Sequence, residues 1–289
     1  MTDSGSIIAG YDGSDEAATA IRWAARQAWL RGLPLQVVHC SLWPLLTRNL
    51  GPVPGVADSG LERAAEAVLE EGLQIAQAAG PGLEIDATLL HGLPASHLAA
   101  LSARHAMLVV GSRGLGGFLG LLVGSVSLEL AAAASCPVAV IRPAPRPEGP
   151  VVVGVDASGS PAALEDACAL AEVEEAGLTV VHVHHTPAGY GHRPLAGDGA
   201  DPESVLAAAV ARARALAPGV PVDGRVLHDT SVPHAILKAS DGARMVVVGS
   251  HGHGMLRETI GSTAHAVLHH ARGPVLIARR GSGEGFRFQ

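Results

Sequence analysis

Short apolar runs alternate with longer amphipathic stretches along the whole chain. Runs rich in Val, Ile and Leu at residues 7–11, 35–40 and 107–110 predict strands that are buried on both faces of a sheet. Stretches with helical spacing and strong helix formers lie between them, as at residues 16–31 and 61–79. Strands that alternate with helices are typical of parallel βαβ units, so the pattern predicts the α/β fold class.

The same order of elements occurs in both halves of the chain. Ser14 or Asp15 can cap the first helix and Gly32 can end it. Because strands and helices alternate in the same order in both halves, each half predicts a doubly wound parallel sheet. The remaining predicted strands are 84–90 and 138–141, then 151–155, 178–183, 222–227, 245–248 and 275–277; the remaining helices are 94–104, 126–134, 162–175, 203–216 and 233–240.

The two halves also carry the same residues at corresponding places. An aspartate ends the first strand and a histidine lies in the second, as Asp12 and Asp156 and as His39 and His182. A linker rich in proline, residues 143–150, separates the halves. We interpret the chain as a tandem duplication with one domain at residues 1–143 and another at 151–280.

Composition narrows the class of protein. The chain has 289 residues, of which 48% are hydrophobic and 16% charged, which is typical of a globular protein with two cores. A net charge of -7 without basic runs argues against a nucleic-acid partner. Three scattered cysteines, Cys40, Cys136 and Cys168, fit a reducing compartment, so we expect a cytoplasmic protein.

One uncharged stretch, residues 114–128, raises the question of a membrane span. Glu129 and Pro137 interrupt its continuation, and the matching segment of the second half contains Arg257 and Glu258. The start of the chain lacks the basic and apolar regions of a signal peptide. We therefore expect a buried segment and no membrane partner.

A glycine-rich segment follows the predicted strand 107–110, and a near copy follows strand 245–248. Glycines that open a helix admit a close approach and direct backbone N–H groups at an anion. The segment lacks the Gly-Lys-Ser/Thr of the common phosphate loop, and Leu119 and Arg257 stand where the dinucleotide fingerprint needs a small residue. Arg113 is the nearest cationic side chain. The alternative is that these glycines only form tight turns.

Taken together, these motifs resemble those of the universal stress protein family, in the tandem form common in actinobacteria. The resemblance rests on Gly-x2-Gly-x9-Gly-Ser after a Val-Val-Gly strand, and on Asp-x-Ser after the first strand. It also rests on the ending His269-His270-Ala271 followed by Pro274-Val275. It covers essentially the whole chain as two family domains.

The resemblance implies Rossmann-like five-stranded sheets of order 3-2-1-4-5 and binding of ATP, with Mg²⁺ held through the phosphates. Asp12 and Asp156 would hold the ribose, although helix capping is the alternative role for each. The main chain of Cys40 and Val183 would contact the adenine. The implied phosphate-binding residues are Gly111, Arg113, Gly114, Gly116, Gly117, Gly124, Ser125, Val126 and Ser127, and then Gly249, Gly252, Gly254, Gly261, Ser262 and Thr263.

Three functions remain open at this point. The leading interpretation is an adenine-nucleotide-binding stress or regulatory protein that is not an enzyme, because no catalytic base has a defined place. The alternative is a slow ATP hydrolase or nucleotidyl-transfer enzyme on the same fold. The third is a structural stress protein with empty sites. Short apolar last strands leave a sheet edge in each half, so we also expect a homodimer.

The histidines do not predict a metal site. His182 and His184 could share one face of a strand, and His265 and His269 are four residues apart on a predicted helix. Neither pair is accompanied by a carboxylate pattern of the kind that binds zinc. We therefore predict no metal held by side chains.

We predict that the two nucleotide sites are unequal. Nine residues separate Gly114 from Gly124, whereas eight separate Gly252 from Gly261. A shorter loop displaces the N–H groups that face the phosphates, and Glu258 adds negative charge there. We expect the first site to bind more tightly and the second to remain functional.

Overall fold

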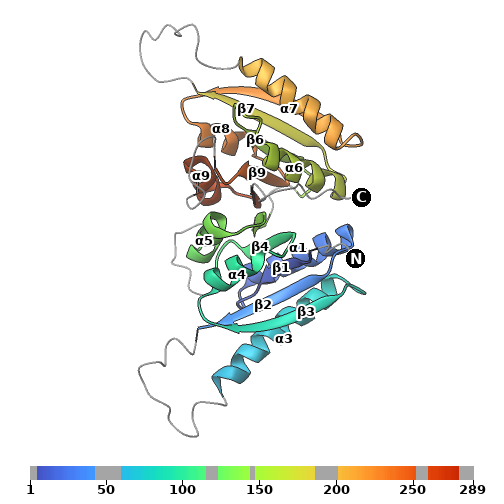
Figure 1. Cartoon of the computed structure of the whole chain (residues 1–289), viewed down its shortest axis with the longest axis vertical. Coiled ribbons are helices and arrows are strands. Elements are labelled where there is room, and N and C mark those ends of the chain that lie inside the picture. The colour runs from blue at the N-terminus through green and yellow to red at the C-terminus, as the bar shows by residue number, and fades with distance from the viewer. Residues whose placement is uncertain are drawn as a thin grey trace. The chain divides into compact units, whose positions relative to one another are not determined.

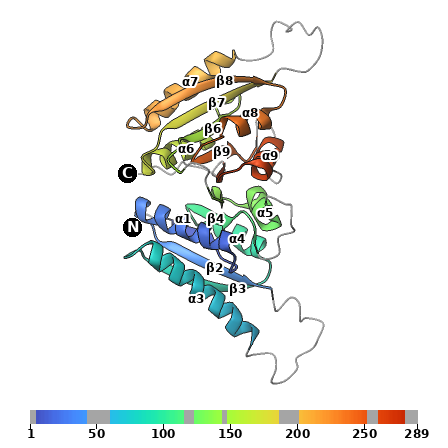
Figure 2. The same ribbon diagram turned by 180° about the vertical axis from the view of Figure 1, so that it is seen from behind.

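Strands and helices alternate within each half of a computed structural model of the chain, which describes residues 5–42, 60–114, 123–143, 147–185, 201–251 and 260–279. The chain divides into two units, Met1–Arg142 and Pro143–Gln289. Figure 1 shows a sheet with helices on both faces in each unit, and Figure 2 shows the same from behind.

The first unit contains a parallel sheet of order β3-β2-β1-β4-β5. Helices α1 and α3 pack together, as do α4 and α5, and right-handed crossovers place the two pairs on opposite faces. Its elements are β1 (Ile7–Gly10), α1 (Asp15–Arg31), β2 (Leu35–Ser41), α3 (Leu61–Ala79), β3 (Ile85–His91), α4 (Pro94–Ser102), β4 (Met107–Gly111), α5 (Ser125–Ala133) and β5 (Val138–Ile141).

The second unit repeats this topology, with a parallel sheet of order β8-β7-β6-β9-β10. Each unit thus confirms the predicted doubly wound α/β fold of order 3-2-1-4-5. The elements are β6 (Val151–Val155), α6 (Pro161–Val173), β7 (Leu178–His185), α7 (Pro202–Leu216), β8 (Val222–Asp229), α8 (Val232–Ala239), β9 (Met245–Gly249), α9 (Ser262–His270) and β10 (Val275–Ala278).

Burial of the strands explains the apolar runs. Every residue of β4 and of β6 is buried, because helices cover both faces of the central strands. By contrast, β3 and β8 lie at one end of their sheets and mix exposed with half-buried residues. The strands that the sequence marks as continuous apolar runs are therefore those that build the core.

The structure also settles where several helices begin and end. Ser14, rather than Asp15, caps α1, since its Oγ accepts a hydrogen bond from Ala17 N at 3.2 Å. Gly32 ends α1 in the left-handed conformation, with φ of 62°. The helix predicted at 162–175 begins at Pro161 and ends at Val173, because Glu175 has a left-handed φ of 50°.

Several predictions concern residues outside the described part of the chain. These residues include nearly all of 43–60 and 186–202, which the predicted domains contain. No helix among the described residues is long and apolar enough to cross a membrane. The described residues also hold no group of three or more His, Cys, Asp or Glu side chains that could bind a metal.

Replacement of Gly111 by alanine should destabilise the first unit. A Cβ there would lie 2.8 Å from the carbonyl carbon of Glu16 and 2.9 Å from Ala17 N, so the backbone of α1 must move. Overpacking of this kind costs about 1–3 kcal/mol in the free energy of unfolding. Urea unfolding followed by tryptophan fluorescence measures it, because all three tryptophans, Trp23, Trp29 and Trp43, lie in the first unit.

Gly249→Ala is the matched control in the second unit. The nearest described atom to its Cβ would be His251 O at 3.4 Å, an ordinary contact. We expect an unfolding transition close to that of the wild type by far-UV circular dichroism. A Gly111→Ala variant as stable as the wild type would contradict the packing argument.

Candidate functional site

The loops that follow β1 and β4 meet at the carboxyl edge of the first sheet. A Cβ on Gly114, after β4, would overlap Oδ2 of Asp12, after β1, so only glycine permits this contact. β1 and β4 are neighbours in the sheet, and the strand order reverses between them. Ligands of open α/β sheets bind at this kind of topological switch point.

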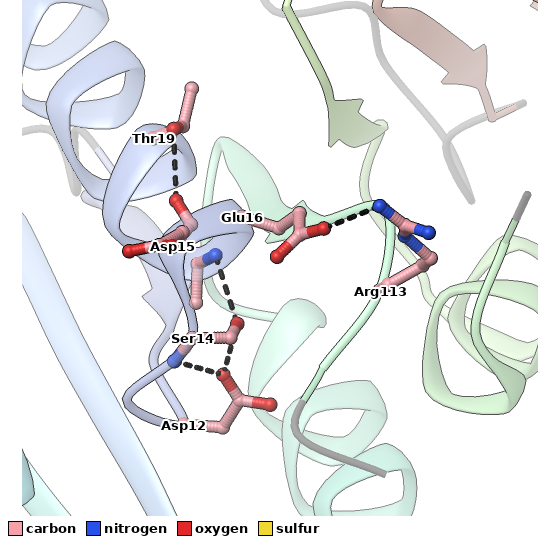
Figure 3. A network of polar contacts seen from close by, with 7 residues as sticks. Asp12, Ser14, Asp15, Glu16, Thr19 and Arg113 are labelled. Carbon is pink, nitrogen blue, oxygen red and sulfur yellow. Dashed lines mark hydrogen bonds and ion pairs between the residues drawn. The ribbon is translucent and has the colours of Figure 1, made fainter. Parts of the chain in front are cut away.

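Hydrogen bonds from Ser14 fix the carboxylate of Asp12. Its Oδ1 accepts bonds from Ser14 N at 3.1 Å and Ser14 Oγ at 2.6 Å (Figure 3). Because Ser14 is the residue that caps α1, Asp12 is not the helix cap. The Asp-x-Ser motif therefore orients a carboxylate at the carboxyl edge and starts the helix at the same time.

A histidine of the second strand holds the residue before each aspartate. His39 Nδ1 donates to Tyr11 O at 2.8 Å, and His182 Nδ1 donates to Val155 O at 3.0 Å. A carbonyl only accepts, so the proton lies on Nδ1 in both rings. The sequence showed that these histidines correspond, and that repetition was the available signal for their positioning role.

The segment after β4 is closed at its base by two hydrogen bonds. Gly124 N donates to Ser112 O at 2.8 Å, and Ser127 Oγ donates to Gly111 O at 2.9 Å. These bonds place the N-terminus of α5 beside the end of β4. Gly124 caps α5 without a side-chain hydrogen bond, and the first turn of a helix presents N–H groups to an anion. That turn contains the predicted residues Ser125, Val126 and Ser127.

Two arginines bring positive charge to the same edge. Arg113 Nη2 lies 2.7 Å from Glu16 Oε1, in the first turn of α1 (Figure 3). Arg142 follows β5 and is buried. Burial and then the nearby charge of Arg113 lower the pKa of Arg142 to about 10, a value at which it remains cationic at neutral pH.

The backbone of Cys40 faces the region beyond the end of β1. Pairing of β1 with β2 stops at Val38, whereas pairing of β2 with β3 continues to Ser41. Val38 O accepts from Tyr11 N on the β1 side, and Ser41 O accepts from Gly92 N on the β3 side. Since alternate residues direct their backbone groups to opposite neighbours, Cys40 directs its N–H and C=O toward the β1 side.

The second unit forms the same aspartate turn but starts its helix differently. Asp156 Oδ1 accepts from Ser158 N at 2.9 Å and Ser158 Oγ at 2.6 Å. Ser160, with a left-handed φ of 42°, precedes α6, and its Oγ accepts from Asp156 N at 3.0 Å. Burial alone raises the pKa of Asp156, but the hydrogen bonds of Ser158 and Ser160 outweigh it and lower the pKa below the ordinary value of 3.8.

The second glycine segment retains the closure but has no counterpart of Arg113. Gly261 N donates to Ser250 O at 2.8 Å, as Gly124 N does to Ser112 O. His251 stands where the first unit has Arg113, and a 2.9 Å hydrogen bond joins its Nδ1 to Ser250 Oγ. Ala264 replaces Ser127, so the hydroxyl bond to the strand is lost. Gly261 leaves α9 without a side-chain cap, beside Ser262 and Thr263.

Described members of each predicted set therefore lie at one edge of their own sheet. In the first unit they come from the ends of β1, β2 and β4 and the start of α5. In the second, Val183 extends past the last β6–β7 pair, at His182, and Gly249 ends β9. The predicted residues Gly116, Gly117, Gly252 and Gly254 lie outside the described residues.

Comparison with known proteins identifies one family across both units. A sequence profile of the universal stress protein family matches residues 4–142 and 149–279. Universal stress protein Rv2005c of Mycobacterium tuberculosis is 33% identical over 291 residues, which covers 95% of this chain and 97% of that protein. Universal stress protein Rv1996 of the same organism is 33% identical over 303 residues and 94% of each chain.

A solved structure shares the fold over its full length. The crystal structure of a universal stress protein from Archaeoglobus fulgidus has a TM-score of 0.72 and covers 97% of this chain and 98% of its own. The two sequences are 23% identical.

Asp156→Asn should reduce the stability of the second unit in a pH-dependent way. The pKa of Asp156 is lower in the folded chain, so its ionised form stabilises the fold above the pKa of the unfolded chain. This contribution disappears as the pH falls through the folded pKa, below 3.8. We expect the wild type to unfold at higher urea than the variant at about pH 6, and the gap between them to shrink at about pH 3.

Far-UV circular dichroism records this difference, and tryptophan fluorescence of the first unit is the internal control. A gap that is the same at both pH values would show that the charge of Asp156 contributes nothing.

Proposed function

The chain belongs to the universal stress protein family as a tandem of two family domains, and we propose that it binds ATP with Mg²⁺ without turning it over. The observation that carries the proposal is the contact between Asp12 and Gly114 beside the N-terminus of α5. It joins a carboxylate, which can accept hydrogen bonds from ribose hydroxyls, to a helix N-terminus that attracts phosphate.

The adenine would lie against the main chain of β2 beyond the end of β1. Cys40 offers a backbone donor and a backbone acceptor on that side, and Val183 has the corresponding position in β7. Adenine carries an amino donor beside a ring-nitrogen acceptor, so one residue of exposed main chain can read it. The distance from β2 to β4 across β1 then separates the base from the phosphates.

The charges of the first unit favour a polyphosphate. Arg113 and Arg142 are both cationic at neutral pH, and the first turn of α5 adds the positive end of its dipole. Mg²⁺ in nucleotide sites keeps several waters and is held largely by the phosphates, which suits an edge with hydroxyls such as Ser125. When bound, the ion would neutralise phosphate charge.

The described side chains around the site support binding rather than turnover. The Asp12 carboxylate accepts a hydrogen bond from Ser14, and His39 Nδ1 donates a hydrogen bond to Tyr11 O. Glu16 is engaged by Arg113. A hydrolase needs a base within hydrogen-bonding reach of the attacking water, and each of these groups has a structural partner. We therefore propose that the nucleotide shifts a conformational or assembly equilibrium.

Two further expectations belong to this proposal. All three cysteines are free thiols, which supports a cytoplasmic location. We also propose a homodimer, since β5 and β10 are short apolar strands of the kind that proteins normally cover.

Gly124→Ala should weaken ATP binding without loss of the fold. A Cβ on Gly124 would meet only Arg113 Cα and Ser112 O, each at 3.7 Å, so the described protein has room for it. The methyl group would instead occupy the space of the phosphates at the N-cap. In an Asp156→Ala background we expect ATP affinity to fall at least about 10-fold, equivalent to about 1.4 kcal/mol, by isothermal titration calorimetry.

Gly219→Ala is the matched control, because nothing lies within 4 Å of its Cβ. If Gly124→Ala binds both ATP and adenosine with the same affinity as the Gly219→Ala control, the placement of the phosphates is overturned.

The two sites should differ in affinity, the first being tighter. The second has His251 in place of Arg113, Ala264 in place of Ser127 and a glycine segment one residue shorter. Calorimetric titration of Asp12→Ala and of Asp156→Ala isolates the second and the first site respectively. We expect Asp156→Ala to retain the tighter binding, and equal affinities or a tighter second site would refute the inequality.

A further inference from the structure

An ion pair joins the start of α1 to the segment that follows β4, at the proposed phosphate position. Glu16 lies in the first turn of α1, and Arg113 lies between β4 and α5. Their side chains are 28% and 45% exposed, so water and a ligand can reach both groups. A partly exposed pair of this kind is weak enough to be exchanged for another partner.

Both partners are attached to fixed backbone next to the N-terminus of α5. Arg113 Cα is 3.7 Å from the place that a Cβ on Gly124 would occupy. The backbone of Glu16 packs on Gly111 so closely that a Cβ there would be 2.8 Å away. An anion at the α5 N-terminus would therefore meet a guanidinium that already has a carboxylate partner.

The local charges make this arrangement responsive to the ligand. Arg142 lies close enough to Arg113 for the charge of Arg113 to contribute to its lowered pKa. Glu16 offsets part of this positive charge. A phosphate group can offset it as well, and bidentate guanidinium–phosphate pairs are strong. Carboxylate and phosphate thus compete for one cation.

We propose that Glu16 competes with the phosphates of a bound nucleotide for Arg113, so that the ion pair reduces the response of the first unit to phosphate charge. This inference rests on the proposed function. The ligand class is a nucleoside polyphosphate. Arg113 contributes no binding free energy to adenosine. To a triphosphate it contributes only the difference between its interaction with the phosphates and its interaction with Glu16.

The second unit lacks both partners. Ser160 stands at the same sequence distance from Asp156 as Glu16 does from Asp12, and His251 replaces Arg113. Among the described residues, the competition is therefore confined to the first unit. If the ion pair only held the loop against α1, the opposite result would be expected, because its loss would loosen the site and lower the affinity for every ligand.

Calorimetric titration of ATP and of adenosine tests the proposal in an Asp156→Ala background. We expect Glu16→Gln to tighten ATP about 5-fold, the upper range for an exposed ion pair, and to leave adenosine unchanged. Arg113→Gln should weaken ATP about 5-fold or more. The matched control is Glu165→Gln, which removes a pair of similar geometry, Arg212 Nη2 to Glu165 Oε1 at 2.6 Å, away from the site.

The double variant separates competition from simple repulsion. Competition requires the gain from Glu16→Gln to shrink when Arg113 is already glutamine. An equal or larger gain without Arg113 would show that Glu16 repels the phosphates directly, and would overturn the proposal. Unchanged or weaker ATP binding in Glu16→Gln, with adenosine bound as in the wild type, would overturn it too. Failure of the wild type to bind either ligand would refute the proposed function itself.

Discussion

The site of the first unit depends on the absence of side chains at Gly111 and Gly114. Without a Cβ at Gly111, the end of β4 reaches the backbone of α1, and without one at Gly114 the following loop reaches the carboxylate of Asp12. These two approaches bring the ends of non-consecutive strands within contact distance. The orientation of Asp12 by Ser14 and the closure of the loop by Gly124 then have a common frame.

The duplicated units retain the frame and differ in charge. Both keep the histidine bond to the residue before the aspartate, and both close the glycine segment through a serine carbonyl. The charged pair of the first unit has no counterpart, since Ser160 and His251 occupy those places. Backbone-directed bonds fix shape, whereas the side chains at the rim set the electrostatic field that a ligand meets. Under the proposed function, one fold therefore presents two phosphate sites that differ in charge.

The pattern of apolar runs and helical spacing was sufficient to predict the α/β fold class, because it reports burial directly, whereas the strand order was implied by the resemblance. That Asp12 and the glycine segment share one site was implied by the resemblance to the family and not by the glycines themselves. The hydrogen bond of His39 was not predictable, because it depends on the register that brings a β2 side chain to the carbonyl of Tyr11. The same holds for Glu16 and Arg113, which are 97 residues apart in the chain and meet only after folding. The start of α6 depends on a left-handed Ser160, which its residue type does not favour.

The direction of the Cys40 backbone has a consequence for how this position can evolve. In the proposed site the base contacts only the main chain and does not constrain the side chain, so one unit can carry cysteine and the other valine at the corresponding place. Burial raises the pKa of the Cys40 thiol to about 11, so the group stays protonated and is a poor nucleophile at neutral pH. Little thiolate is therefore present at Cys40 to react with an oxidant. The side chain at this position is thus chemically unreactive, and a substitution there leaves the proposed main-chain contacts with the base unchanged.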